Sequence, residues 1–593
     1  MVVPRALFLA SLLGAASALS GFPHGRPHAQ MLPMPSPPMA DAPVVPVTDV
    51  NGTELPPLTT IYTFEQLIDH NNPSAGTFTQ RYYHTWQFYV AGGPIIIFTP
   101  GEANFQGYSG YLSNTTVNGR FAQENGGATI VLEHRFFGFS NPKPDLTDES
   151  LKLHTIDQAV DDLVYFAKNV KLPMPGGDQV TPDKAPWILV GGSYSGALTS
   201  WVMNARPGVF WAGYSSSGVV ETLTDFWGYF EPIRQHGPKN CTNDVISVIS
   251  HVDEVLSKGT PEEIFAVKSN FGMANLTHLD DVAGALRFNL FDWQSLSPTS
   301  PRSALFYRFC DAIEVKDGVV SDEKGWGLEH AFKAWGTFWN TTYMDLTCGP
   351  GADVVDCLGT YDPTQAFWHN TTINNSGRSW TWFVCNWVGY FFDGAPQNWP
   401  SLTTRLVQPE YDERQCTYWF DKKLTKPTPP ETERTNRVFK GWEGKVDRLF
   451  FANGARDPWR EATMSTDFVN IASTETQPIA MSDGFHCTDL IISAGTTDVT
   501  VKQVQDLASA YMGKWVAEWH AANPKRPKGV KHTFPDPRTL PHPGVKRVGV
   551  PSSIANAPAG TAPSLPVTPG RATGSHRTNW ALRNPMIRQV VRV

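Results

Sequence analysis

The stretch PWILVGGSYSGALTSW, Pro186–Trp201, decides the fold of this chain. An apolar run ends at two glycines, two serines with a tyrosine between them follow, and a helix-like pattern then begins. A nucleophile elbow, which presents a serine between a buried strand and a helix, needs small residues two before and two after that serine. Centred on Ser193 the frame is Gly-Gly-Ser-Tyr-Ser, which favours Ser193 over Ser195 as the nucleophile. A glycine-rich turn without chemistry is the alternative.

Strand-like and helix-like segments alternate around this stretch. GGPIIIFTPG (92–101) and ATIVLEHRFFG (128–138) contain continuous apolar runs bounded by turn residues, which is typical of strands covered on both faces. LHTIDQAVDDLVYFAKNV (153–170) predicts a helix with Thr155 as its N-cap. FWAGYSSSG (210–218) predicts one more strand. This alternation indicates an α/β fold with a mostly parallel sheet and helices on both faces.

The pattern changes between about residues 221 and 440, where strand-like runs vanish and six of the seven cysteines occur. We interpret this region as a largely helical insertion stapled by disulfides. Proximity in the sequence suggests the pairs Cys241–Cys310, Cys348–Cys357 and Cys385–Cys416, with Cys487 free, although spacing alone cannot prove connectivity. The α/β alternation returns at 447–459 and 477–486 and closes with a helix-like pattern at 501–520.

Both ends of the chain differ from its middle. MVVPRALFLASLLGAASALS has a charged start, a short apolar run and an A-x-A cleavage site, which together predict a secretory signal. The basic, proline-rich end carries twelve Lys or Arg against one acid from residue 525 onward, so the rest of the chain has a net charge of −19. An acidic body of this kind suits an acidic medium. The predicted organisation is a signal peptide (1–18), a disordered or pro-segment (19–59), an α/β-hydrolase domain in two parts (60–220 and 441–522) around a helical cap (221–440), and a disordered tail (523–593).

Export is also supported by cysteine content and by glycosylation motifs, because disulfides persist in oxidising compartments. The sequons are at Asn51, Asn114, Asn240, Asn275, Asn340, Asn370 and Asn374. We expect a secreted, extracellular protein, with a vacuolar or lysosomal lumen as the alternative. No later segment is apolar over the length of a bilayer, so we expect no membrane partner. A solvated tail is favoured over one that binds nucleic acid.

A serine needs a histidine as base and a carboxylate that orients the histidine, and in this fold the chain order is Ser, Asp, His. FFANGARDPWRE places Asp457 just after a predicted strand, and SDGFHCTDL places His486 just after the next one. Asp-Pro is usually only a turn and a lone histidine is usually a surface or packing residue. Their order behind an elbow makes Ser193, Asp457 and His486 a candidate triad.

GGSYSGALTSW, NGARDPW and DGFHCTDL, together with EHRFFG and FTPGE, resemble the serine peptidase family of lysosomal Pro-X carboxypeptidase, dipeptidyl peptidase II and the acid prolyl endopeptidases of fungi. The resemblance runs from about Tyr62 to Trp519 and is strongest to the fungal enzymes, which share GGSYSG. It implies an α/β-hydrolase with a helical cap, cleavage after proline, and the roles of nucleophile, base and orienting acid for the same three residues.

Further residues follow from the elbow and from the resemblance. The N–H of Tyr194 should meet the oxyanion, with a second donor near Gly101. Trp459 is expected as a wall for the proline ring. Glu102 is expected near the substrate, and Glu102 and Glu133 are equally open to a structural role.

Several functions stay open on the sequence alone. Within the peptidase class these are an acid-active prolyl endopeptidase, a Pro-X carboxypeptidase and a dipeptidyl peptidase, all acting on proline-containing peptides or proteins. Outside it they are an extracellular esterase or lipase on the same scaffold and a non-enzymatic binding module, which is disfavoured because no triad residue is missing. No cofactor and no metal are expected for any of these reactions.

Overall fold

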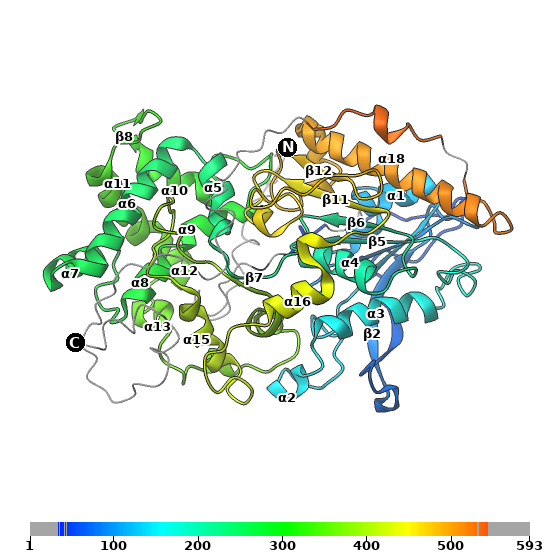
Figure 1. Cartoon of the computed structure of the whole chain (residues 1–593), viewed down its shortest axis with the longest axis horizontal. Helices are drawn as coiled ribbons and strands as arrows, with labels where there is room; N and C mark the ends of the chain where they lie inside the picture. The colour runs from blue at the N-terminus through cyan, green and yellow to red at the C-terminus, as the bar shows by residue number, and fades with distance from the viewer. Residues whose placement is uncertain (1–33, 35, 41, 43, 531–532, 544–593) are drawn as a thin grey trace, which may run out of the picture.

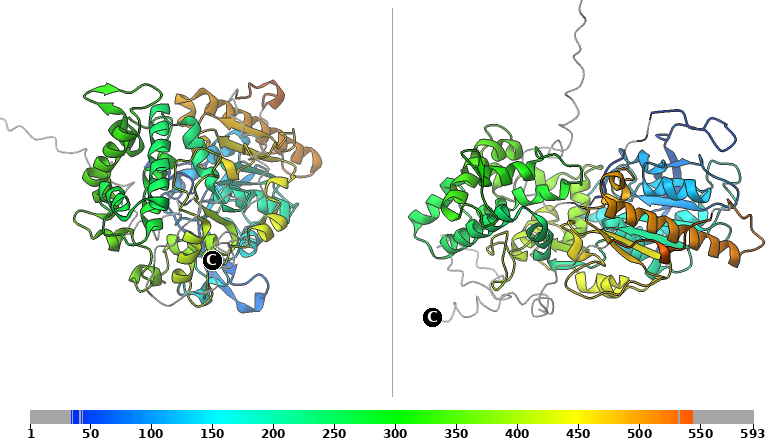
Figure 2. Two further views of the ribbon diagram at one scale, coloured as in Figure 1. Left: turned by 60° about the vertical axis from the view of Figure 1, so that its left-hand side comes forward. Right: turned by 90° about the horizontal axis from the view of Figure 1, so that it is seen from above.

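The computed structural model describes residues 34, 36–40, 42, 44–530 and 533–543. The expected signal peptide (1–18) lies outside the described residues, as do most of the tail and the start of the 19–59 segment. Figure 1 shows two side-by-side parts, a helical part in green and an α/β part that contains the large sheet. The two views of Figure 2 show the same division.

An eight-stranded sheet forms the centre of the α/β part. In order across the sheet, its strands are β1 (Tyr62–Leu67), β2 (Thr77–Thr85), β4 (Ala128–Leu132), β3 (Ile95–Thr99), β5 (Trp187–Gly192), β6 (Ala212–Ser216), β11 (Leu449–Gly454) and β12 (Ile479–Ser482). β2 pairs antiparallel with both β1 and β4, and every other pairing is parallel. The predicted α/β-hydrolase fold with a mostly parallel sheet is confirmed.

Helices cover both faces of this sheet, which explains why its strands are continuously apolar. Residues Ile95 and Ile97 of β3 face one cluster of buried side chains, and Ile96 and Phe98 face the other. The covering helices are α3 (Ile156–Asn169) and α4 (Tyr194–Ala205) on the first face, and α1 (Val117–Asn125) and α18 (Val499–Ala522) on the second. The Thr155 hydroxyl accepts a hydrogen bond from Gln158 N at 3.2 Å, as expected for the N-cap of α3.

The cap lies between β6 and β11 in the sequence and is mainly helical. Its α-helices are α5 (Glu231–His236), α6 (Lys239–Lys258), α7 (Pro261–Asn270), α8 (Leu279–Ala285), α9 (Phe288–Phe291), α10 (Leu305–Glu314), α11 (Leu328–Phe338), α12 (Met344–Cys348), α13 (Val354–Leu358), α14 (Ser376–Phe383), α15 (Pro409–Trp419) and α16 (Thr432–Phe439). The described cap also has two short two-stranded sheets, β7 (Leu223–Asp225) with β10 (Gly389–Phe391), and β8 (Val315–Lys316) with β9 (Val319–Val320). One cluster of buried apolar side chains continues from the α3–α4 face of the sheet into the cap.

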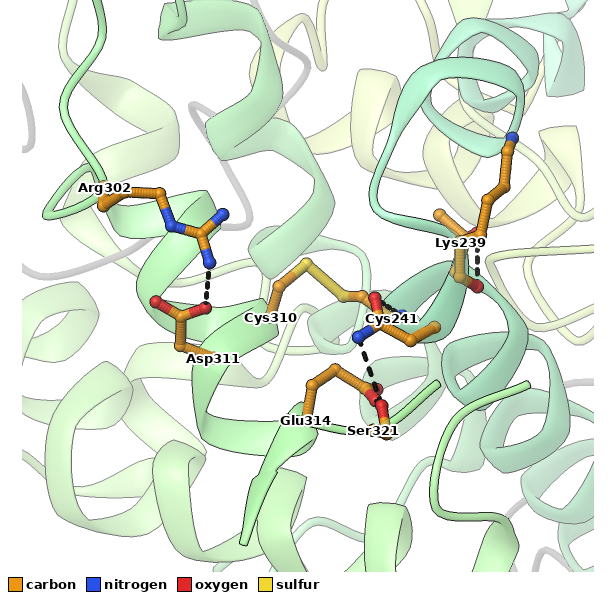
Figure 3. The surroundings of a disulfide bond; sticks show 9 residues. Lys239, Cys241, Arg302, Cys310, Asp311, Glu314 and Ser321 are labelled. Carbon is orange, nitrogen blue, oxygen red and sulfur yellow. Dashed lines mark hydrogen bonds and ion pairs between the residues drawn. A yellow bond between two sulfur atoms is a disulfide. The ribbon is translucent and has the colours of Figure 1, made fainter. Parts of the chain in front are cut away.

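The three disulfides are those that sequence proximity predicted, and all lie in the cap. Cys241 on α6 is bonded to Cys310 on α10, as Figure 3 shows. Cys348–Cys357 joins α12 to α13, and Cys385–Cys416 joins a π-helical turn (Val384–Val388) to α15. Cys487 is free, as predicted, and it is buried.

Parts of the two terminal segments pack against the α/β part, which corrects the expectation of disorder there. Val47, Leu55 and Leu58 are buried in the cluster on the α1–α18 face. In the tail, the ring of Phe534 lies so close to Gly513 of α18 that a Cβ there would fall 2.2 Å from it. These apolar side chains give each segment surface to bury, which the composition of the whole segment conceals.

Among the residues that the structure describes, no helix combines the length and the apolar character needed to cross a bilayer.

Candidate active site

Ser193 occupies a strained turn between β5 and α4. Its backbone has φ 64° and ψ −124°, a conformation that residues other than glycine rarely adopt. Gly191 has no room for a side chain, because a Cβ there would lie 1.9 Å from Ser195 O. The requirement for a small residue two positions before the nucleophile is therefore met by a backbone contact within the turn itself.

Ser195 holds this turn together. Its hydroxyl donates to Gly192 O at 2.8 Å and accepts from Gly192 N at 3.1 Å. These bonds explain why serine can replace glycine two positions after Ser193. The Ser195 hydroxyl therefore both donates to and accepts from the backbone of the elbow.

The three candidate triad residues meet at the carboxyl ends of their strands. Asp457 follows β11 and His486 follows β12. His486 Nε2 lies 2.6 Å from Ser193 Oγ, and His486 Nδ1 lies 2.8 Å from Asp457 Oδ1. Asp457 Oδ1 also accepts from Trp459 N at 2.9 Å, which fixes the carboxylate toward the imidazole. An imidazole between a hydroxyl and a carboxylate can take the hydroxyl proton and remain correctly oriented.

All three side chains are buried, and this sets their electrostatics. Ser193 and Asp457 are 0% exposed and His486 is 8% exposed. Burial disfavours the imidazolium, but the charge and hydrogen bond of Asp457, with a further contribution from the Cys487 side chain, raise the pKa of His486 well above its usual range. Burial raises the pKa of the neighbouring Cys487 thiol, which keeps it neutral and unsuited to act as a nucleophile.

The residues expected at the oxyanion adjoin the elbow. Tyr194 begins α4, so its N–H has no acceptor within the helix. Gly101, at φ 71°, packs against the turn, since a Cβ there would meet Tyr194 and Ser195 at 3.1 and 3.2 Å. The N–H of Gly101 donates to Thr99 Oγ1 at 3.3 Å in this structure.

The two glutamates that the sequence left open have different surroundings. Glu133 accepts from Arg81 Nη2 at 2.6 Å and from Ser140 N at 2.8 Å, so it has a structural role. Glu102 is fully buried, and neither of its carboxylate oxygens has a hydrogen-bond partner among the described residues. Burial raises the pKa of Glu102 well above its usual range, although its own N–H, the Ser36 side chain and the charge of His486 oppose the change.

Trp459 lies at the centre of a set of aromatic rings beside the triad. Its ring centroid is 6.4 Å from that of His486. Four cap residues surround it at 5.3–5.6 Å, namely Phe226, Tyr229, Tyr390 and Phe392. Its Nε1 donates to Gln294 Oε1, another cap side chain, at 2.8 Å. Only Trp459 was predicted from the sequence, because nothing in the spacing distinguishes these four aromatic residues from the many others in the cap.

A family model described as "Serine carboxypeptidase S28" matches residues 66–283 and 352–507. The chain belongs to this family. The match includes the elbow, Asp457 and His486, and it is interrupted within the cap. The peptidase is therefore a serine-type hydrolase, as predicted.

Curated relatives agree with this assignment. The peptidase is 34% identical to "Serine protease vicPa" of Bipolaris victoriae (strain FI3) over 480 residues, covering 78% of this chain and 90% of the relative. It is 30% identical to "Probable extracellular serine carboxypeptidase" of Arthroderma benhamiae, covering 74% of this chain and 64% of the relative. It is 28% identical to "Lysosomal Pro-X carboxypeptidase" of Pongo abelii, covering 79% and 91%.

Among solved structures, the haloalkane dehalogenase DatA from Agrobacterium tumefaciens C58 matches with a TM-score of 0.29 and 10% identity, covering 77% of this chain and 98% of the other. Potato epoxide hydrolase I matches with a TM-score of 0.29 and 9% identity, covering 74% and 97%.

Six of the seven sequon asparagines are exposed: Asn51, Asn114, Asn275, Asn340, Asn370 and Asn374. Asn240 is half-buried, and its Nδ2 donates to Ser321 Oγ at 3.1 Å. Asn340 Nδ2 donates to two backbone carbonyls of the cap. A glycan on Asn240 or Asn340 would have to replace these hydrogen bonds.

Proposed function

We propose that this peptidase is exported from the cell and hydrolyses peptide bonds on the C-terminal side of proline, as an acid-active endopeptidase. Ser193 is the nucleophile, His486 the general base and then acid, and Asp457 the orienting carboxylate. The observation that carries the proposal is His486 within hydrogen-bond distance of both Ser193 Oγ and Asp457 Oδ1.

The reaction follows from these contacts. Ser193 Oγ attacks the carbonyl carbon while its proton passes to His486 Nε2, and Asp457 stabilises the imidazolium that forms. His486 then gives the proton to the leaving amine, and the C–N bond breaks to leave an acyl-enzyme. Water, deprotonated by His486, attacks the ester and releases the acid product and Ser193. The raised pKa of His486 favours the charged intermediate of both halves.

Backbone donors would stabilise the negative oxygen of each tetrahedral intermediate. The N–H of Tyr194 is available at the start of α4. We assign the second donor to the loop at Gly101, whose N–H would have to exchange Thr99 Oγ1 for the oxyanion.

Proline preference is supported by the aromatic rings around Trp459 and by a relative whose name specifies Pro-X substrates. The proline ring offers no N–H for recognition, so flat apolar walls are the contacts that can select it. An esterase or lipase on this fold would instead hydrolyse acyl esters without this preference.

Replacing Trp459 by alanine should lower kcat/KM for a proline peptide by about 10–100-fold, because an apolar contact of this size contributes on the order of 1–3 kcal/mol to discrimination. For the matched peptide with alanine in place of proline, kcat/KM should fall much less. The ratio of kcat/KM for the proline peptide to kcat/KM for the alanine peptide should therefore decrease. Trp211 at the opposite end of β6 provides the control, since Trp211→Ala removes a tryptophan remote from the triad. An unchanged ratio in Trp459→Ala would contradict the assignment of the proline wall.

A Pro-X carboxypeptidase is the second candidate, favoured by Glu102. A buried carboxyl with a raised pKa is neutral and can donate a hydrogen bond to the terminal carboxylate of a substrate, whereas it suits a terminal ammonium poorly. Mass spectrometry of products from an N-blocked peptide with proline in its interior separates the candidates, at acidic and at neutral pH. Internal cleavage excludes both exopeptidase modes, and the release of only the last residue supports the carboxypeptidase.

The acid-active part of the proposal rests on buried carboxyls and not on His486, whose raised pKa alone would favour neutral conditions. Burial raises the pKa of Asp292, beside the aromatic set, from 3.8 to about 8. It also raises the pKa of Glu221 and Glu314 to about 7. Each group binds its proton more tightly in the folded chain than in the unfolded chain. The stability that it contributes is therefore fully present below the pKa that the group has in the unfolded chain. That stability is lost as pH rises through the folded pKa.

The melting temperature should therefore fall by about 5 °C or more between about pH 5 and about pH 8. Asp292→Asn keeps a neutral side chain at every pH and should reduce this fall. Asp345→Asn, at an exposed position, is the control and should leave it unchanged. Thermal unfolding followed by circular dichroism across the range measures both. A melting temperature that rises toward pH 8 would contradict the acid assignment.

A further inference from the structure

The site that would bind substrate is covered in this structure. Ser193, Asp457 and Trp459 are each 0% exposed. A peptide could not reach Ser193 Oγ without displacing whatever covers it. The chain's own N-terminal segment lies beside the site: Met34 and residues 36–40, which we call the N-terminal strap, contact Gln294, Glu102 and Gly192.

The first contact of the strap is with the aromatic set. Met34 O accepts a hydrogen bond from Gln294 Nε2 at 2.8 Å. The other end of the same amide, Gln294 Oε1, accepts from Trp459 Nε1 at 2.8 Å and from Tyr229 Oη at 3.1 Å. One cap side chain thus joins the strap to the proposed proline wall.

The middle of the strap lies against the elbow and Glu102. The side chain of Ser36 is beside the buried carboxyl of Glu102. The charge of His486 also acts on this carboxyl and lowers its pKa. Pro37 is buried, and a Cβ on Gly192 would fall 2.9 Å from Pro37 Cβ. Gly192 immediately precedes the nucleophile, so the strap packs against the catalytic turn.

The far end of the strap is tied to the α/β part by hydrogen bonds. Tyr108 Oη donates to Pro37 O at 3.0 Å, and Tyr111 Oη donates to Pro38 O at 2.8 Å. Ala40 N donates to Gly107 O at 2.9 Å, and Ala40 O accepts from Gly110 N at 2.7 Å. These bonds use strap carbonyls in the way a bound peptide would use its own.

We propose that the N-terminal strap is an intramolecular inhibitor that occupies the substrate cleft and must leave, or be removed, before the peptidase can act. Its sequence, MPSPPMA over residues 34–40, is rich in proline, as expected for an occupant of a cleft that selects proline. The buried residues Val47 and Leu55 anchor the chain just after the strap. A tether this short keeps the local concentration of the strap high, near the millimolar range. This inference rests on the proposed function for its account of the cleft.

Pro37→Asp in the full-length chain tests the proposal, because an aspartate there would bury a charge beside the elbow and expel the strap. The matched control is Pro46→Asp, at an exposed position beyond the strap. The readout is the rate at which diisopropyl fluorophosphate labels Ser193, measured by intact mass. This reagent needs an activated serine but no proline, so the readout is independent of substrate preference.

We expect Pro37→Asp to be labelled about tenfold faster or more than the wild type, because labelling is slowed by the fraction of molecules with the strap in place. Pro46→Asp should match the wild type. A synthetic peptide of residues 34–40 should slow labelling of Pro37→Asp, and the same peptide with aspartate at position 37 should not. Equal labelling of the three proteins would overturn the proposal.

If Pro37→Asp is poorly folded, the double variant Tyr108→Phe/Tyr111→Phe serves in its place. It removes the two hydroxyl donors to the strap and keeps both rings in the core. Faster labelling supports the strap as inhibitor, and wild-type labelling of a folded double variant contradicts it. Fast labelling without any preference for proline peptides would overturn the proposed function while leaving the inhibitor role intact.

Discussion

Replacing Ser193 by alanine is expected to lower kcat by about a millionfold, the size of effect seen when a triad nucleophile is removed. The loss should be in kcat with little change in KM, since the aromatic set that would bind the substrate is untouched. The hydrolysis of a chromogenic proline peptide by the purified variant measures the loss of kcat. If the strap inhibits, the assay uses enzyme without the strap. Circular dichroism establishes that the variant is folded.

Ser195 provides the matched control, because it lies two residues away in the same turn. Among the described residues its hydroxyl bonds the backbone of Gly192 alone, so Ser195→Ala should cost stability and less than about tenfold in kcat. If Ser195→Ala is the inactive variant and Ser193→Ala retains activity, the nucleophile has been assigned to the wrong serine.

Asp457→Asn should lower kcat by about 10⁴-fold. The amide of the variant can donate to His486 Nδ1. This hydrogen bond favours the tautomer whose proton lies on Nε2, and a protonated Nε2 cannot accept the proton of Ser193 Oγ. The volume of the side chain would be preserved, but the amide nitrogen that donates to His486 Nδ1 would occupy the place of Asp457 Oδ1 and so remove the acceptor for Trp459 N. The pH profile of kcat/KM is the second readout, since the pKa of His486 should fall when the carboxylate charge is lost.

Asp483 is the control for this carboxylate. It lies on the same loop as His486 but forms an ion pair with Arg456, and it is half-exposed. Asp483→Asn should change kcat by less than about tenfold, as expected for a surface ion pair. Equal losses in Asp457→Asn and Asp483→Asn would show that kcat is sensitive to any loss of a carboxylate near His486, and would contradict the role assigned to Asp457.

The buried parts of the sheet were predictable because their strands are covered on both faces. Ile95, Ile96 and Ile97 are all buried, so the run reads as apolar without interruption. β1 and β2 were not predicted as strands, since they form the antiparallel edge, and β1 alternates between exposed and half-buried residues. The cysteine pairs were predictable because the six cysteines of the cap pair in sequence order, the first with the second, the third with the fourth and the fifth with the sixth.

The candidate triad was predictable from local signals that the fold then combines. The elbow, Asp457 after β11 and His486 after β12 each carry a short motif, and parallel strands bring their carboxyl ends to one edge. The partners of Trp459 have no such motif, because Phe226 and Tyr390 reach it only through the packing of the cap. The strap was hidden for a different reason: its proline content resembles disorder, and its hydrogen bonds are made to Tyr108 and Tyr111, about 70 residues away.

The apolar cluster on the α3–α4 face of the sheet continues into the cap, so the two parts share one buried apolar surface. Opening the two parts like a jaw would expose that cluster to water, at about 25 cal/mol for each Å² uncovered. We therefore expect the two parts to stay together while the enzyme turns over. Unfolded chains could then reach the site, and compact native proteins would be spared until something else unfolds them.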